Sequence, residues 1–163
     1  MTANLHIFEH TRESLKSAMK EAGLKPFRAD QVWQWVYKKG VVAPSKMTNL
    51  SKSDQEKLAS VVDFSMPEII AEQKAIDGTI KWLIKLHDGQ EVEMVFIPQG
   101  KRGTLCVSSQ VGCTLTCRFC HTGTQALARN LTAADIVTQV WIAKAQMHDF
   151  TPDDTARTLP NIV

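Results

Sequence analysis

All four cysteines of this 163-residue chain lie in one stretch, from Cys106 to Cys120, and no other feature constrains the fold as strongly. The opening residues lack the basic-then-apolar order of a secretory signal, so the chain is expected to be cytoplasmic and to lack a disulfide framework. Three of the cysteines, Cys113, Cys117 and Cys120, are spaced C-x3-C-x2-C. This spacing predicts a single loop that wraps three thiolates around one metal centre.

Iron–sulfur clusters are held by thiolates, and a cubane cluster usually takes four of them. Three ligands leave one iron with an open coordination position, as a catalytic centre requires. Two alternatives stay open. The first is structural zinc, with Cys117 and Cys120 as half of a site that Cys113 or His121 completes, although the chain has no second short pair of cysteines. The second is a set of ordinary buried thiols.

Residues 1–62 are predicted to form a small helical domain. The first helix is expected from near Thr11 to Ala22, before Gly23. The second follows Pro26-Phe27 and ends at Gly40, with an apolar stripe at helical spacing. The third is expected to begin near Ser53, where Ser53-Asp54-Gln55-Glu56 has the pattern of a capping box.

After Pro67 the chain changes to short apolar and β-branched runs, separated by Asp77-Gly78 and Asp88-Gly89. Such dipeptides are typical of tight turns between strands. Strands are predicted near 68–74, 79–86 and 91–97. Residues 63–98 should therefore form an antiparallel strand segment that leads into the core.

A further strand is expected at 104–109, leading into the cysteine loop, and Thr132-Ala133-Ala134-Asp135 predicts the capped start of a helix. The last residues, 159–163, have the pattern of a strand that has just begun. A strand, loop, helix and strand in this order open a parallel α/β fold. The predicted fold class is therefore α/β, with residues 99–163 as the truncated start of a (βα) partial barrel that begins near Gly103. The cysteine loop should leave the strand that contains Cys106, because active sites of such folds lie at the carboxyl ends of strands.

The net charge of +2 is too small to indicate a nucleic-acid partner. The charge is uneven, however, because residues 1–60 carry ten Lys and Arg against six Asp and Glu, a net +4. A basic front half could hold an RNA backbone, but solvated helix faces would give the same count. No run approaches the roughly 18 apolar residues that span a bilayer, so no membrane association is expected.

Three segments carry a resemblance to a known family: Glu91–Pro98 (EVEMVFIP), Cys106–Cys113 (CVSSQVGC) and Phe119–Gly123 (FCHTG). Together with Phe27–Gln31 and Trp35–Tyr37 of the helical front, they closely resemble the dual-specificity rRNA/tRNA adenine carbon-2 methyltransferases. These enzymes are members of the radical S-adenosylmethionine (SAM) superfamily. The resemblance covers essentially the whole chain. It implies a 4Fe-4S cluster on Cys113, Cys117 and Cys120, whose free iron chelates SAM.

The resemblance also implies a reaction with two SAM molecules. One methylates a cysteine of the enzyme, and the other is reductively cleaved at the cluster to a 5'-deoxyadenosyl radical, which activates that methyl group. The methylene radical adds to carbon 2 of an adenine in 23S rRNA or tRNA, a position without nucleophilic character. The implied partners are these RNAs and an external electron donor such as flavodoxin, and the expected state is a monomer.

Two further residues receive roles from the resemblance. Cys106 is the thiol that resolves a covalent RNA–protein intermediate by forming a disulfide with the methyl-bearing cysteine; from the residue alone it would be a small buried strand residue. Glu93 is the proton acceptor, and a carboxylate in apolar surroundings tends to have a raised pKa, which suits a general base. From the residue alone, Glu93 would be a solvent-facing strand charge.

Two parts of the family pattern are expected beyond Val163: the methyl-accepting cysteine and a glycine-rich segment whose glutamate holds the SAM amino group. The chain by itself is therefore expected to be inactive. Two alternatives for the function stay open. The chain could belong to an enzyme that methylates adenine carbon 8 in rRNA, since such enzymes share the cluster loop, or it could be a metal-stabilised RNA-binding module without catalysis.

Overall fold

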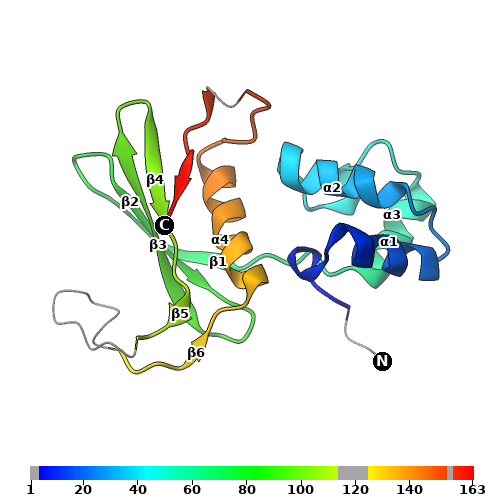
Figure 1. Cartoon of the computed structure of the whole chain (residues 1–163), viewed down its shortest axis with the longest axis horizontal. Helices are drawn as coiled ribbons and strands as arrows, with labels where there is room; N and C mark the ends of the chain where they lie inside the picture. Colours follow the sequence, from blue (N-terminus) through cyan, green and yellow to red (C-terminus); the bar gives the residue numbers. More distant parts are fainter. Residues whose placement is uncertain (1–3, 114–124, 154–155) are drawn as a thin grey trace. The chain divides into compact units, whose positions relative to one another are not determined.

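The computed structural model describes residues 4–113, 125–153 and 156–163. The chain divides into two units (Figure 1). The helical unit comprises Met1–Met66 and Lys144–Arg157, and the sheet unit comprises Pro67–Ala143 and Thr158–Val163. Helices and a mixed sheet together confirm the predicted α/β class.

The helical unit contains three helices, α1 (Arg12–Glu21), α2 (Arg28–Lys39) and α3 (Lys52–Val61), with short 3-10 turns at Ile7–Glu9 and Pro44–Lys46. All three helices were expected from the sequence. Their apolar stripes meet in one core because residues three and four apart share a helix face. Its fully buried members are Ile7, Leu15, Val32, Val36, Met47 and Leu58.

The start of α3 differs from the sequence prediction. The cap is Ser51, whose hydroxyl oxygen accepts a hydrogen bond from the Asp54 backbone N–H at 3.1 Å. Ser53 lies inside the helix, so the predicted capping box at Ser53 is wrong. A cap needs a hydroxyl oxygen that reaches the N–H two or three residues on, and Ser51 meets this need two residues earlier.

Segment 144–157 belongs to the helical unit although it lies about a hundred residues downstream in the sequence. Gly40 ends α2 in the left-handed conformation, with φ +65°. A Cβ at Gly40 would run into the ring of Phe150. Two requirements, the backbone angle and the close approach of the ring, therefore favour glycine here.

The sheet unit contains a five-stranded sheet in the order β1-β2-β3-β4-β7. The first four strands, β1 (Glu68–Lys74), β2 (Ile80–Lys85), β3 (Glu91–Gln99) and β4 (Arg102–Cys106), pair antiparallel. The short β7 (Asn161–Ile162) pairs parallel to β4. The predicted strands at 68–74, 79–86 and 91–97 are confirmed to within two residues.

The predicted strand at 104–109 is not continuous. β4 ends at Cys106, and the chain then forms β5 (Gln110–Val111), which pairs with β6 (Arg129–Asn130) in a separate two-stranded sheet. α4 (Ala133–Gln146) follows, and its start is capped as predicted: the Thr132 hydroxyl oxygen accepts the Asp135 N–H at 3.1 Å, and the Asp135 carboxylate accepts the Thr132 N–H at 2.9 Å. The order β4, α4, β7 confirms the predicted opening of a parallel α/β arrangement.

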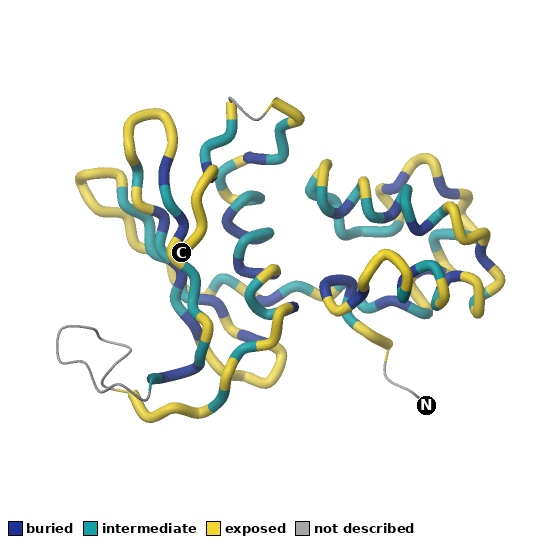
Figure 2. The backbone as a smooth tube through the Cα atoms, in the orientation of Figure 1, coloured by how far each residue is buried: buried dark blue, intermediate teal, exposed yellow. Residues whose placement is uncertain are grey.

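The two faces of the main sheet differ in burial (Figure 2). One face is buried, and α4, whose buried residues run from Ala134 to Ala143, lies beside the sheet (Figure 1). The other face is open, and its side chains alternate with the buried ones because successive strand residues point to opposite sides. The buried face contains Trp82, Ile84, Val92, Met94, Phe96 and Leu105, and the open face contains Lys81, Leu83, Glu93, Val95, Thr104 and Cys106. Within the described residues, no helix is long and apolar enough to cross a membrane.

Candidate active site

The structure brings Glu93 and Cys106 to the same open face of neighbouring strands. Cys106 lies directly opposite Val95 in the β3–β4 pair. Glu93 is two residues before Val95 on the same strand, so it is the diagonal neighbour of Cys106. Diagonal neighbours in an antiparallel pair lie about 7–8 Å apart, within reach of one small molecule between their side chains.

The Cys106 side chain is exposed at the end of β4 and carries a free thiol. The interpretation of Cys106 as a small buried residue is therefore wrong. Its neighbour Leu105, by contrast, is fully buried. An exposed thiol at a strand end is accessible for chemistry.

Glu93 has only part of the apolar surroundings that its chain neighbours indicate. Val92 and Met94 point to the buried face, whereas the Glu93 carboxylate forms an ion pair with Lys81 at 3.0 Å on the open face. The side chains of Glu93 and Lys81 are 32% and 40% exposed. The carboxylate shares its face with the apolar Leu83 and Val95 as well as with Lys81, so the expectation of a carboxylate among apolar groups holds only in part.

A cavity of about 420 Å³ connects Glu93 with the residues that flank the cysteine loop. Its wall includes Glu93 from β3, Ser108 and Gln110 after β4, Gly112, and Gln125 from the far side of the loop. A volume of this size accommodates a drug-sized ligand. Glu93, the predicted proton acceptor, and the two ends of the cysteine loop therefore line the same cavity.

Cys113 stands at the base of the cysteine loop, directly after β5. Its backbone N–H donates to the Gln125 carbonyl at 3.1 Å, which closes the base. Gly112 has φ +74°, and a Cβ there would run into the Ala126 carbonyl, so the two ends of the loop can meet only at a glycine. Cys117 and Cys120 lie outside the described residues.

The three cysteines are spaced C-x3-C-x2-C, and thiolates so close in sequence fit the donor set of one iron–sulfur cluster. The predicted origin of the loop is nearly right, since it follows the Cys106 strand after the short β5.

Arg129 forms two ion pairs beside the cysteine loop, with Asp88 and with Asp135, and these three residues are called the brace. The Arg129 guanidinium donates to Asp88 in the β2–β3 turn at 2.7 Å and to Asp135 at the start of α4 at 2.9 Å. The hydrogen bond from Arg129 lowers the pKa of Asp88. For Asp135, burial acts to raise the pKa, but the hydrogen bonds from Thr132 and Arg129 outweigh it and lower the pKa. The brace therefore connects β6 to two other elements through ionised carboxylates.

Ser108 and Gln139 are two polar residues of this site that sequence reasoning did not identify. Gln139 is fully buried on α4 and bonds to the Ser108 backbone, and the Ser108 hydroxyl donates to the Glu93 carbonyl at 2.8 Å. The serine could have been noted from its place two residues after Cys106. No local pattern separates Gln139 from a solvated helix residue.

A solved structure resembles this arrangement. A radical SAM methyltransferase from Sphaerobacter thermophilus matches with a TM-score of 0.83 and 35% identity, over 97% of this chain and 45% of that chain. The mixed sheet, the short β5 that leads from the Cys106 strand to Cys113, and the cysteine spacing thus define the class: the fold is that of the N-terminal part of a radical SAM methyltransferase.

The sequence comparisons narrow this class. Residues 4–63 match the family model "Ribosomal RNA large subunit methyltransferase N-terminal domain". The dual-specificity RNA methyltransferase RlmN of Rhodospirillum rubrum is 50% identical over 154 residues, which are 94% of this chain and 36% of the relative. The RlmN of Paracoccus denitrificans is 46% identical over 170 residues, 99% of this chain and 44% of the relative. Over the length that it spans, the chain is similar to these RlmN proteins, which confirms the predicted resemblance. It spans less than half the length of these relatives.

Proposed function

We propose that the chain is the N-terminal part of a radical SAM enzyme that methylates carbon 2 of an adenine in 23S rRNA and in tRNAs. The observation that carries this proposal is the meeting of Glu93 and Cys106 on one open sheet face, next to the closed base of the cysteine loop. The names of the relatives support an RNA substrate. The proposal also places the protein in the cytoplasm, as a monomer that does not associate with a membrane.

Cys113, Cys117 and Cys120 would hold a 4Fe-4S cluster that binds SAM. The cluster supplies the electron for reductive cleavage of SAM, and an external donor such as flavodoxin would provide that electron. The protein's own contribution is a loop that is closed at its base by the Cys113–Gln125 hydrogen bond.

Glu93 and Cys106 would act on the RNA. Glu93 would accept the proton of carbon 2 once the methylene carbon has bonded there, and the cluster, oxidised by the cleavage of SAM, would serve as the acceptor for the unpaired electron of the adduct. The Cys106 thiolate then attacks the sulfur of the methyl-bearing cysteine, so that an S–S bond forms and the carbon–sulfur bond breaks. The electron pair of that bond moves to the methylene carbon, which takes up a proton and becomes the methyl group of the RNA.

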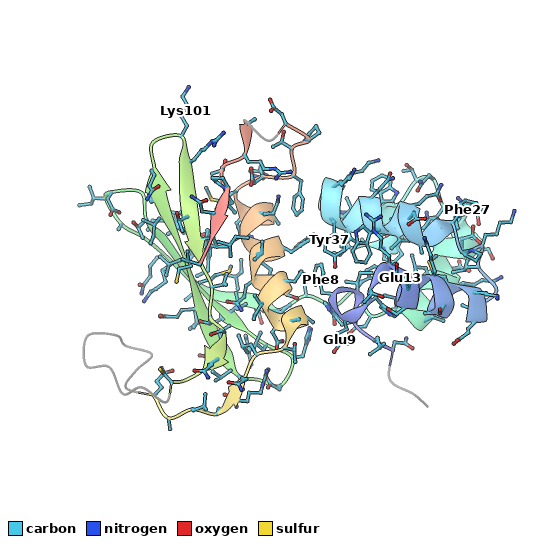
Figure 3. The ribbon with its side chains drawn as sticks, in the orientation of Figure 1. Phe8, Glu9, Glu13, Phe27, Tyr37 and Lys101 are labelled. Atoms are coloured by element: carbon cyan, nitrogen blue, oxygen red, sulfur yellow. The ribbon has the colours of Figure 1, made fainter. Side chains whose placement is uncertain are left out.

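The helical unit would serve as an accessory RNA-binding domain. Cations lie over aromatic rings along or beside α2: Lys39 over Trp35 at 3.8 Å, Arg28 over Phe27 at 5.1 Å and Arg12 over Trp33 at 5.5 Å. The Phe27 side chain is 52% exposed (Figure 3). Positive charge beside flat rings is the combination that binds single-stranded RNA, through phosphate contacts and base stacking.

RNA binding by the helical unit can be measured on the chain itself. Phe27→Ala should weaken binding of an RNA stem-loop, since stacking on an aromatic ring contributes about 1–3 kcal/mol per base. Lys39→Ala should reduce both affinity and its dependence on salt. Lys101→Ala, at an exposed position beside β4, is the control (Figure 3). Equal losses in all three variants would contradict a specific role for the helical unit.

A chimera tests the proposed reaction. The chain would replace the matching segment of the Rhodospirillum rubrum relative, and the chimera would be incubated anaerobically with SAM, a reductant and unmethylated RNA. Mass spectrometry of the digested RNA should detect 2-methyladenosine. Detection of 8-methyladenosine instead would show the carbon-8 activity, and SAM cleavage without RNA methylation would contradict the proposal.

A further inference from the structure

We infer that Gln139 and Ser108 form a clamp that positions Glu93 and Cys106 relative to each other. The inference rests on the proposed function and adds two positioning residues to it. Ser108 lines the candidate cavity, but neither residue is assigned a chemical step in the proposed reaction. Their role follows from hydrogen bonds that join α4, the end of β4 and the middle of β3.

Gln139 is the buried half of the clamp. Gln139 is 0% exposed. The oxygen and the nitrogen of its side-chain amide both form hydrogen bonds with the backbone of one residue, Ser108. Oε1 accepts the Ser108 N–H at 2.9 Å, and Nε2 donates to the Ser108 carbonyl at 3.0 Å. Nε2 also donates to the Asp135 carbonyl at 3.3 Å. The amide thus satisfies both backbone groups of Ser108, as a neighbouring strand would.

Ser108 needs these hydrogen bonds from Gln139 because β4 ends at Cys106 and no strand among the described residues pairs with Ser108 on that side. Residues on either side of Ser108 bond in different directions: the Val107 N–H donates to the Val163 carbonyl, and the Ser109 carbonyl accepts from Leu131. Ser108 therefore lies where the chain leaves the main sheet for β5. Without Gln139, its N–H and carbonyl would lose these hydrogen bonds at a part-buried position.

Ser108, which Gln139 holds by its backbone, forms a hydrogen bond with β3 through its side chain. Its hydroxyl donates to the Glu93 backbone carbonyl at 2.8 Å, two residues beyond the last β3–β4 pair at Val95 and Cys106. The bond continues the β3–β4 pairing through a side chain, so Glu93 stays fixed beside the strand end that carries Cys106. Since the carboxylate and the thiol must act in turn on the same covalent RNA–protein intermediate, their separation decides whether that intermediate is released.

The choice of residues is specific. A glutamate at position 139 would place an oxygen against the Ser108 carbonyl, and a leucine would leave both Ser108 groups unpaired. Ser108→Ala removes only the bond to Glu93 and leaves the Gln139 contacts in place. Thr138→Val is the matched control, because Thr138 is also buried on α4 but its hydroxyl bonds only to Ala134 of the same helix.

The first test uses the chain without any cofactor. Hydrogen exchange followed by NMR should show a protected backbone amide at position 108 in the parent chain and in the Thr138→Val and Ser108→Ala variants. Gln139→Leu should lose that protection while α4 amides remain protected. A Ser108 amide that exchanges equally in the parent chain and in Gln139→Leu would overturn the clamp.

The second test uses the chimera and separates positioning from folding. Ser108→Ala should cleave SAM and retain iron like the parent chimera, but should yield about tenfold less methylated RNA per SAM cleaved, with more RNA left covalently attached to protein. Ser108→Thr, which keeps the hydroxyl, should restore the ratio. An unchanged ratio in Ser108→Ala would overturn the inference, as would a parallel fall of SAM cleavage and methylation. A parent chimera that forms neither methylated RNA nor a covalent adduct would instead contradict the proposed function, whereas the exchange experiment would still report on the clamp.

Discussion

Replacing Cys106 with Ala should stop the proposed reaction at one step and leave the fold unchanged. The Cys106 side chain is exposed at the end of β4, so its truncation opens no cavity. Exposed substitutions of this kind usually change the free energy of unfolding by less than about 0.5 kcal/mol. Leu105, the preceding residue, is 0% exposed, and Leu105→Ala should cost about 2–5 kcal/mol. The two variants therefore separate a chemical role from a structural one on a single strand.

Urea unfolding of the chain, followed by tryptophan fluorescence, would measure both effects, because the buried Trp82 reports on the sheet unit. The midpoint of Cys106→Ala should coincide with that of the parent chain, and the midpoint of Leu105→Ala should fall. In the chimera, Cys106→Ala should retain its iron and cleave SAM. Radiolabelled RNA should then migrate with the protein on a denaturing gel and be released by protease, because no thiol breaks the carbon–sulfur bond.

Three results would refute this reasoning. A loss of unfolding free energy comparable to that of Leu105→Ala would show that Cys106 is a packing residue. Loss of iron in Cys106→Ala would make the thiol a ligand or a structural support of the cluster. Normal turnover would show that release needs no thiol from this strand.

Three further predictions concern the structure around the site. The lowered pKa values of Asp88 and Asp135 mean that both carboxylates stay ionised in the folded chain at a pH where the unfolded chain takes up protons, so stability is present above about pH 4 and lost as the pH falls through the lowered values. Arg129→Gln should flatten this dependence in urea unfolding at pH 7, 5 and 3; an unchanged dependence would contradict the brace. Gly112→Ala should prevent cluster reconstitution, measured as bound iron, because its Cβ would push the Ala126 carbonyl away from the loop base. Gly40→Ala should lower the melting temperature of the helical unit, since φ is +65° and Phe150 fills the space; a melting temperature equal to the parent's would count against that packing.

Local patterns were enough to predict most elements of secondary structure. The turn dipeptides Asp77-Gly78 and Asp88-Gly89 separate β1, β2 and β3, and β1 coincides with the predicted 68–74. The alternation of Trp82 and Ile84 with Lys81 also predicted which face of β2 is buried. These features depend on residues close in sequence, where backbone preference and side-chain period act directly.

Features that depend on tertiary contacts were not predictable in the same way. After β4 ends at Cys106, the backbone of Ser108 bonds to Gln139, which lies 31 residues further along the chain and looks in the sequence like an ordinary polar helix residue. The packing of Phe150 against Gly40 joins segments that no periodicity connects. The surroundings of Glu93 were predicted only in part, because its direct neighbours Val92 and Met94 lie on the other face and Lys81 reaches it from the adjacent strand.

Anaerobic reconstitution of the chain with iron and sulfide tests the central claim most directly. The account predicts about four irons per chain, the absorption and Mössbauer signature of a 4Fe-4S cluster, and loss of both in Cys113→Ala, Cys117→Ala and Cys120→Ala. Cys106→Ala should bind the same amount of iron as the parent chain. Stoichiometric zinc without a cluster, or full iron retention in any of the three ligand variants, would contradict the assignment of this chain to radical SAM chemistry.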